Sequence, residues 1–196
     1  FPTPAALAAA ELDDVRAAWA GLGFYRRAAL LHKGAQHVTS VHGGTLPGTA
    51  ATLLDVPGIG PYTAAAVASV CFHERVPVVD GNVIRVMSRL MGWRDVDAKA
   101  PATAERVRRA AAALVAGDEN PGDLNQGLME VGATVCRPNG APACTDCPLA
   151  SVCRARAMMA AGELLAIEGT IPLTQAAASK RHDRFVAVGV VRRIDG

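Results

Sequence analysis

The feature that most constrains the fold of this chain is a hairpin signal between two helix-forming stretches. The sequence Val56-Pro-Gly-Ile-Gly-Pro-Tyr-Thr-Ala64 joins the segment 49–54 to the alanine-rich segment 62–72. Gly58 and Gly60 can adopt positive φ at low cost, and without Cβ atoms they let another backbone approach closely. The stretch therefore predicts two helices joined by a tight Gly-Ile-Gly hairpin.

The hairpin is also a candidate anion site. Gly58, Ile59 and Gly60 place backbone N–H groups at the start of the following helix, an arrangement that binds nucleic-acid phosphates. Further along, Asp80 in Val78-Val-Asp-Gly-Asn-Val83 stands at the expected start of another helix. Each feature alone has a simpler interpretation, either an ordinary glycine turn or an aspartate that only caps a helix. Their combination indicates a phosphate contact followed by a positioned carboxylate.

Composition and periodicity favour an all-α fold. The 196 residues are 51% hydrophobic and 4% aromatic, and the net charge of +2 permits a nucleic-acid partner through local contacts. Alanine favours helix, and no apolar run reaches the length of a membrane span. We expect helices at 11–19, 24–41, 49–54, 62–72, 81–91, 102–116 and 122–135.

The composition of the sequence changes near the C-terminus. Residues 166–184 read as a linker, and the β-branched run at 185–191 reads as a strand that cannot fold alone. We therefore expect the start of a further domain at 185–196, after helical subdomains at 1–79 and 80–165. The chain begins without Met, which suggests a piece of a longer protein.

Four of the five cysteines form a dense group with the spacing C-x7-C-x2-C-x5-C, and they are Cys136, Cys144, Cys147 and Cys153. Nothing indicates secretion, so disulfides are disfavoured. Structural zinc usually uses two well-separated C-x2-C pairs and is the weaker alternative. A compact loop of four thiolates suits a cubane iron–sulfur cluster better. Cys71 lies in an apolar helix and is expected to be a small buried residue.

Taken in order, the hairpin, the aspartate at a helix start and the cysteine loop make the chain resemble a known family. It resembles the helix-hairpin-helix base-excision glycosylases that carry a 4Fe–4S cluster, and within them the MutY-type adenine DNA glycosylases. The resemblance runs from Phe1 to about Arg156. The matching segments are Gly21-Leu-Gly-Phe-Tyr-Arg-Arg-Ala28, Leu31-His-Lys33, His42-Gly-Gly-Thr-Leu-Pro47, Val56–Ala64, Val79-Asp-Gly-Asn-Val83 and Leu124-Asn-Gln-Gly-Leu-Met-Glu-Val-Gly-Ala133.

The resemblance implies excision of adenine mispaired with 8-oxoguanine or guanine in duplex DNA, after the base is flipped out of the stack. It makes Asp80 the carboxylate that stabilises the oxocarbenium-like sugar, with Asn82 and Tyr62 in the same site and Tyr62 hydrogen bonding near Asp80. It assigns DNA contacts to Gly58, Ile59 and Gly60 and to the wedge segment of Leu22, Gly23 and Phe24. It also implies a 4Fe–4S cluster on the four grouped cysteines and allows a monovalent cation at the hairpin.

Tyr62 separates two chemistries. Endonuclease III-like relatives place a lysine at this position, where its amine forms a Schiff base and cuts the strand. The sequence has Tyr62 there and no lysine between Lys33 and Lys99, so we expect monofunctional base removal. A glycosylase-lyase and a non-catalytic DNA-binding module with a structural metal remain as alternatives.

Three departures from the family pattern affect these expectations. The catalytic glutamate of the family would precede Phe1, so the chain as given is expected to be impaired. Phe24 stands where the family usually has an intercalating tyrosine, and it can still stack but lacks the hydroxyl. The first cysteine gap has one residue more than is usual for the family.

The remaining expectations concern the surroundings of these motifs. The region at 185–196 resembles the start of a Nudix-like domain, and we expect a monomer, cytoplasmic and nucleoid-associated, with no membrane contact. Arg26, Arg27 and Lys33 are either phosphate contacts or a solvated helix face, Tyr25 is expected in the core, and Trp19 and Trp93 are expected to be packing residues.

Overall fold

The computed structural model describes residues 1–173, and all regular elements in this range are helical. Asp97 and Leu173 form an isolated parallel bridge. The predicted all-α class is confirmed, whereas the expected strand at 185–191 lies outside the described residues. The elements are α1 Pro4–Ala8, α2 Leu12–Ala18, α3 Tyr25–His42, α4 Ala50–Leu53, α5 Pro61–Phe72, α6 Gly81–Leu90, α7 Pro101–Ala116, α8 Pro121–Glu130, the π-helical turn η1 Val131–Val135 and α9 Arg154–Ala160.

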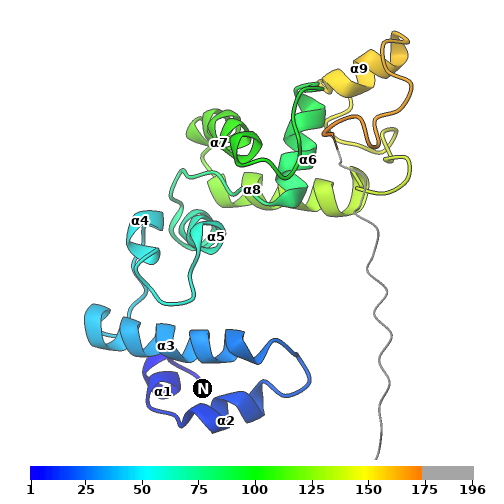
Figure 1. Ribbon diagram of the computed structural model, residues 1–196. Coiled ribbons are helices and arrows are strands. Elements are labelled where there is room, and N and C mark those ends of the chain that lie inside the picture. Colours follow the sequence, from blue (N-terminus) through cyan, green and yellow to red (C-terminus); the bar gives the residue numbers. More distant parts are fainter. Residues whose placement is uncertain (174–196) are drawn as a thin grey trace, which may run out of the picture.

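The helices follow one another through space roughly in chain order (Figure 1). Helices α1 and α2 pack on α3 at one end, and the α4–α5 hairpin lies in the middle. Helix α5 packs on α8, which together with α6 and α7 forms the larger bundle, and α9 packs on α6. The sequence missed the short helices α1 and α9, and the single helix expected at 122–135 is α8 continued by η1. The subdomain boundary at 79/80 stays a prediction.

The hairpin packs on α3 through backbone-to-backbone contact. A Cβ built on Gly34 would lie 2.9 Å from the carbonyl oxygen of Pro57, and one built on Gly58 would lie 3.0 Å from Leu30 Cβ. Gly58 has φ +89°, so it serves both as a turn residue and as a point of close approach. Gly60 has φ −96° and is the N-cap of α5, with Pro61 as the first helical residue.

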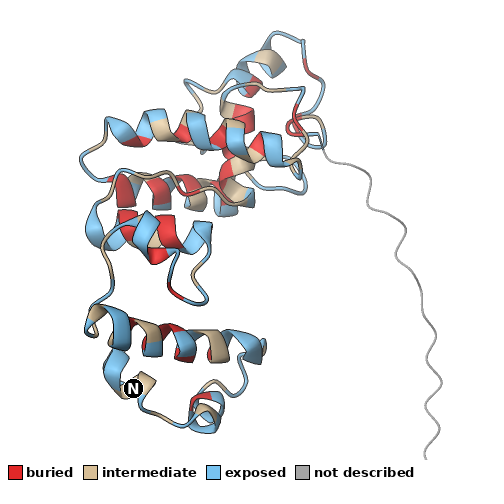
Figure 2. Cartoon of the chain, turned by 60° about the vertical axis from the view of Figure 1, so that its left-hand side comes forward, coloured by how far each residue is buried: buried red, intermediate tan, exposed pale blue. Residues whose placement is uncertain are grey.

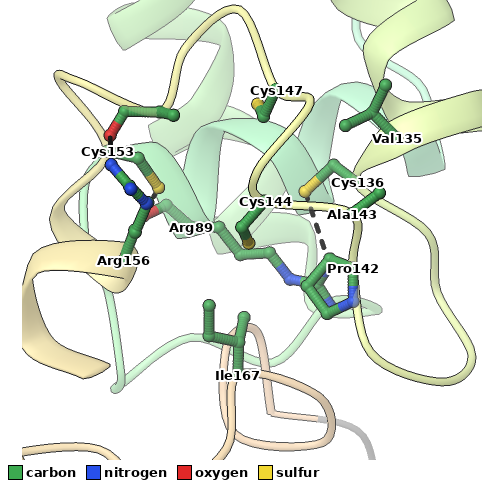
Figure 3. Close-up of a pocket in the computed structure, with 11 residues that line it drawn as sticks. Arg89, Val135, Cys136, Pro142, Ala143, Cys144, Cys147, Cys153, Arg156 and Ile167 are labelled. Atoms are coloured by element: carbon green, nitrogen blue, oxygen red, sulfur yellow. Dashed lines mark hydrogen bonds between the residues drawn. The ribbon is translucent and has the colours of Figure 1, made fainter. Parts of the chain in front are cut away.

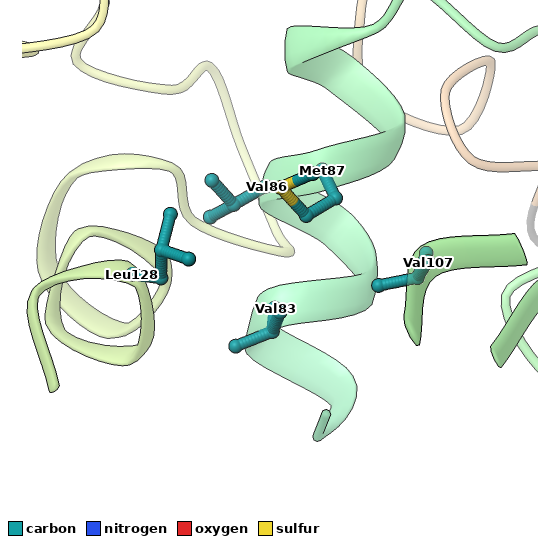
Figure 4. Close-up of a cluster of buried hydrophobic side chains, with 5 residues drawn as sticks. All are labelled: Val83, Val86, Met87, Val107 and Leu128. Carbon is teal, nitrogen blue, oxygen red and sulfur yellow. The ribbon is translucent and has the colours of Figure 1, made fainter. Parts of the chain in front are cut away.

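The main core lies between α6, α7 and α8 (Figure 4). Val83, Val86 and Met87 occupy positions i, i+3 and i+4 of α6 and therefore share one face of the helix. Val107 and Leu128 complete the buried cluster. Each such burial contributes about 1.5–3 kcal/mol, which fixes the axis of the helix that begins at Asp80. Buried residues also line the mutually facing sides of α5 and α8 (Figure 2).

Two burial expectations are wrong. Cys71 is exposed, because it lies in the last turn of α5, beyond Ser69, the last residue of that helix to be buried. Tyr25 is 48% exposed, because it is the first residue of α3 and follows the exposed turn that carries Leu22 and Phe24. None of the described helices has the length and apolar character that a bilayer crossing requires.

Candidate active site and cysteine cavity

Asp80 is fixed at the N-terminus of α6 by both of its carboxylate oxygens. The backbone N–H of Val83 donates to Oδ1 at 2.7 Å, which is the N-cap bond that the sequence predicted. The amide of Asn82 donates to Oδ2 at 3.0 Å. The carboxylate is half-buried and lies where the helix dipole stabilises negative charge. Asp80 is thus a held anion with lone pairs still available on each oxygen.

The extended segment before Asp80 is anchored by Asn125 of α8. The N–H of Val78 donates to Asn125 Oδ1 at 3.0 Å, and Asn125 Nδ2 donates to the carbonyl of Val76 at 2.9 Å. Asn125 is completely buried. Its side chain replaces the backbone partners that a neighbouring strand would supply. Sequence reasoning placed Asn125 in a family motif but gave it no role.

Arg85 connects the Asp80 side of α6 to the cysteine loop. Its Nη2 donates to Asn82 Oδ1 at 2.8 Å and to the Gly132 carbonyl at 2.7 Å, and its Nε donates to the Cys136 carbonyl at 2.7 Å. Burial lowers the pKa of Arg85, the positive charge of Arg89 lowers it further, and Cys136 and Asp80 oppose the shift. Arg85 is therefore a half-buried link between α6, η1 and the first of the grouped cysteines.

Tyr62 lies on α5 and turns toward α8. Its hydroxyl donates to Met129 Sδ at 3.4 Å, so the structure shows a partner on α8 where the sequence led us to expect a hydrogen bond near Asp80. The side chain is about half-exposed. Gly132 lies on η1, three residues after Met129, and a Cβ on Gly132 would lie 2.6 Å from Asn82 Cβ. Tyr62 and Asn82 therefore contact neighbouring turns of the same α8–η1 element, and the role of Tyr62 in catalysis stays a prediction.

The four grouped cysteines line one cavity (Figure 3). Its empty volume is about 330 Å³, part of it open to solvent. Within residues 1–173, no three Cys, His, Asp or Glu side chains are arranged to hold a single metal ion. Burial raises the pKa of the Cys144 thiol, and the other three cysteines raise it further, whereas Arg89 lowers it. The lining residues are Arg89, Val135, Cys136, Pro142, Ala143, Cys144, Cys147, Ala150, Cys153, Arg156 and Ile167.

Arg89 is the buried cation of this cavity. Its Nη1 lies 3.4 Å from Cys136 Sγ and donates to the Arg137 carbonyl at 2.9 Å, while its Nε donates to the Ile171 carbonyl at 2.9 Å. Only 3% of Arg89 is exposed. A buried guanidinium satisfied by carbonyls and beside a thiol is suited to an anionic group in the cavity.

The seven-residue gap between Cys136 and Cys144 forms a fixed loop. The N–H of Ala143 donates to the Val135 carbonyl at 3.1 Å, which closes the base of the loop. The N–H of Gly140, at its tip, donates to Glu168 Oε1 at 2.7 Å. The loop therefore accommodates the additional residue while the cysteines on both sides face the same cavity.

The predicted wedge segment lies in the turn between α2 and α3. Leu22 and Phe24 project into solvent, and Phe24 is 79% exposed. Phe24 has φ +49° and serves as the N-cap of α3. A large apolar side chain displayed in a left-handed backbone conformation is uncommon and points to a function at this turn.

Comparisons with known proteins agree with this architecture. The family model for the HhH-GPD superfamily base excision DNA repair protein matches residues 1–126. The adenine DNA glycosylase of Arabidopsis thaliana is 44% identical over 88% of this chain and 27% of that protein. The human adenine DNA glycosylase is 44% identical over 85% of the chain and 30% of that protein, and the Mycobacterium tuberculosis one is 42% identical over 76% and 48%. The chain thus spans about a quarter to a half of the length of these relatives.

Solved structures show the same fold. A thermostable thymine-DNA glycosylase superposes with a TM-score of 0.68 at 26% identity, covering 80% of this chain and 71% of that one. Endonuclease III in a trapped covalent intermediate with DNA superposes with a TM-score of 0.64 at 25% identity, covering 82% and 72%. The family model and the relatives confirm the resemblance read from the hairpin, Asp80 and the cysteine loop, and the chain belongs to the HhH-GPD superfamily of base excision DNA repair proteins.

Proposed function

We propose that this chain carries the Asp80 site of a monofunctional adenine DNA glycosylase, which hydrolyses the N-glycosidic bond of adenine opposite 8-oxoguanine or guanine. The observation that carries the proposal is the carboxylate of Asp80, held by Val83 and Asn82 at a helix start. The adenine DNA glycosylases that are 42–44% identical support the choice of base. A pure binding module has no need of an anion fixed at this point.

Asp80 acts on the sugar. As the bond to adenine breaks, the deoxyribose becomes oxocarbenium-like, and a fixed anion nearby lowers the energy of that transition state. Because Asp80 is already oriented by two N–H donors, the site need not reorganise when the charge develops. Asn82 and Arg85 keep the carboxylate in place, since Arg85 Nη2 fixes the amide that donates to Asp80. The resemblance assigns protonation of the leaving adenine to a glutamate upstream of these motifs.

Tyr62 supports hydrolysis over strand cleavage. A lyase needs an amine that attacks the sugar and forms a Schiff base. A phenol at this position, engaged with Met129, offers no such amine. Water then completes the reaction and leaves an abasic site. The glycosylase-lyase alternative, favoured only by the structural likeness to endonuclease III, predicts a strand break.

The hairpin and the wedge would hold the duplex. The N–H groups of Gly58, Ile59 and Gly60 precede α5 and would bind a phosphate, with a monovalent cation at the same turn as a further candidate. Phe24 would stack into the helix beside the mispair and help to stabilise the extruded base. We further propose that the protein acts as a monomer on DNA in the cytoplasm, associated with the nucleoid.

The cysteine cavity would hold a 4Fe–4S cluster. Cys136, Cys144, Cys147 and Cys153 supply the thiolates that such a cluster requires, and they surround a space with the buried cation of Arg89 beside it. When bound, the cluster would supply a fixed anionic body that links the end of η1 at Cys136 to the start of α9 at Cys153, beside Arg89 of α6. Cys147→Ser should lose visible absorption, iron and sulfide from the purified protein, and the matched change at exposed Cys71 should keep them. Stoichiometric zinc without iron would contradict this assignment.

The test of the function is single-turnover release of adenine from a duplex with one adenine–8-oxoguanine pair, using the full-length protein encoded by the gene. Asp80→Asn keeps an oxygen for the cap but removes the charge, so release should fall by orders of magnitude while binding persists. Strand scission should require alkali. Scission without alkali would favour the lyase, and tight binding with no release by the wild type would favour the binding module.

A further inference from the structure

The turn that presents Phe24 holds its backbone in a conformation that most residues avoid. Gly21, Gly23 and Phe24 have φ of +87°, +65° and +49°. A Cβ on either glycine would meet nothing within 4 Å, so the glycines are needed for their dihedral angles and not for space. Phe24 has no such freedom, and a left-handed residue with a side chain persists only where its surroundings determine it.

Trp19, the C-cap of α2, is tied to both ends of this turn. Its carbonyl accepts from the N–H of Leu22 at 3.2 Å, and its indole Nε1 donates to the carbonyl of Gly23 at 2.9 Å. The guanidinium of Arg27 lies over the indole ring at 5.7 Å, and the N–H of Arg27 donates to the Phe24 carbonyl at 2.7 Å. One aromatic side chain thus joins the end of α2, the glycine before Phe24 and the first turn of α3.

We propose that Trp19 is a positioning residue that holds Phe24 ready to insert into DNA, an inference that rests on the proposed function. The exposed ring of Phe24 gains nothing from folding, because it is mostly in water. Stacking between bases would remove the ring from water, but only if the ring already points outward when the protein meets DNA. The indole-to-Gly23 bond orders the backbone before binding, so the ordering cost is met on folding and not on association.

Trp19→Phe tests this effect, because it keeps an aromatic ring beneath Arg27 but replaces the indole, with its N–H donor, by a smaller ring that cannot donate. If the proposal is right, the variant should melt like the wild type but bind the adenine–8-oxoguanine duplex about fivefold to tenfold more weakly, the factor expected for one hydrogen bond. The matched control is Trp93→Phe, since Trp93 also stacks with an arginine, Arg106, yet lies between α6 and α7. This control should bind like the wild type.

A double-mutant cycle with Phe24→Ala supplies the decisive measurement. If Trp19 acts through Phe24, the change at Trp19 should have no further effect on affinity once the ring of Phe24 is gone. Gly23→Ala is the second variant; it opposes φ +65° without a steric clash, so its loss should likewise vanish in the Phe24→Ala background.

The possible outcomes distinguish a failure of the positioning role of Trp19 from a failure of the proposed function. Phe24→Ala that binds mispaired DNA like the wild type would overturn the wedge itself and, with it, this part of the proposed function. A loss in Phe24→Ala with an independent, additive loss in Trp19→Phe would overturn only the positioning role. A lowered melting temperature in Trp19→Phe with unchanged affinity would show that the indole merely packs.

Discussion

Replacing Asn125 by alanine should destabilise the protein through two backbone groups that it leaves behind. The amide of Asn125 pairs with the N–H of Val78 and the carbonyl of Val76, and the side chain is completely buried. Each buried group that loses its partner costs about 1–3 kcal/mol, while alanine returns a small gain in helix propensity. We therefore expect the free energy of unfolding to fall by about 2–4 kcal/mol.

The neighbouring Gln126 provides a matched control for the same truncation. It is exposed, and its amide donates to the carbonyl of Gly122, one turn earlier in α8. Gln126→Ala should change the free energy of unfolding by less than about 0.5 kcal/mol. Urea unfolding of both variants, followed by circular dichroism at a fixed wavelength, gives the comparison.

The same experiment also tests whether Asn125 serves the site. Val76 and Val78 lead directly into Asp80, so freeing them should loosen the start of α6 and slow base release in the variant that remains folded. Equal stability losses for Asn125→Ala and Gln126→Ala would refute the reasoning, because they would show that the two buried hydrogen bonds of Asn125 add nothing to stability.

Two pairs of glycine substitutions test the close packing and the backbone angles described above. Gly132→Ala places a Cβ 2.6 Å from Asn82 Cβ, so it should lower the free energy of unfolding in urea by about 2 kcal/mol or more and reduce base release. Gly127 lies in α8 with open space around it, so Gly127→Ala should raise the free energy of unfolding by about 0.5–1 kcal/mol. Gly58→Ala opposes φ +89° and should cost about 2–3 kcal/mol, whereas Gly60→Ala at φ −96° should cost less than about 1 kcal/mol. Equal effects within either pair would contradict the packing described here.

Short segments of the sequence were sufficient to predict the features that depend on residues close together in the chain. The Gly-Ile-Gly turn, the N-cap position of Asp80 and the grouping of the cysteines each depend on residues close together in the chain, and the structure has all of them. Periodicity located the longer helices to within a few residues. It missed the short helices α1 and α9, which lack the acidic first-turn residues that marked α2, a helix as short as α9.

Contacts between distant segments could not be predicted in this way. The bonds of Arg85 to Gly132 and Cys136 join α6 to η1 and to the residue that follows it, and a surface arginine gives the same sequence signal as a half-buried one. Tyr62 illustrates the same limit, since its position on α5 was correct but its partner on α8 depends on how the two helices pack. Such pairings are decided by tertiary packing, which only the folded arrangement shows.

The two readings of Asp80 that the sequence left open, a structural cap and a reactive carboxylate, are compatible in the structure. Capping uses Oδ1 and the Asn82 amide uses Oδ2, and each carboxylate oxygen can accept more than one hydrogen bond. The cap even favours the chemistry, because it removes the rotational freedom of the side chain before any substrate is present. A helix N-terminus is thus a suitable place for a reactive anion, and the structural bond makes its position precise.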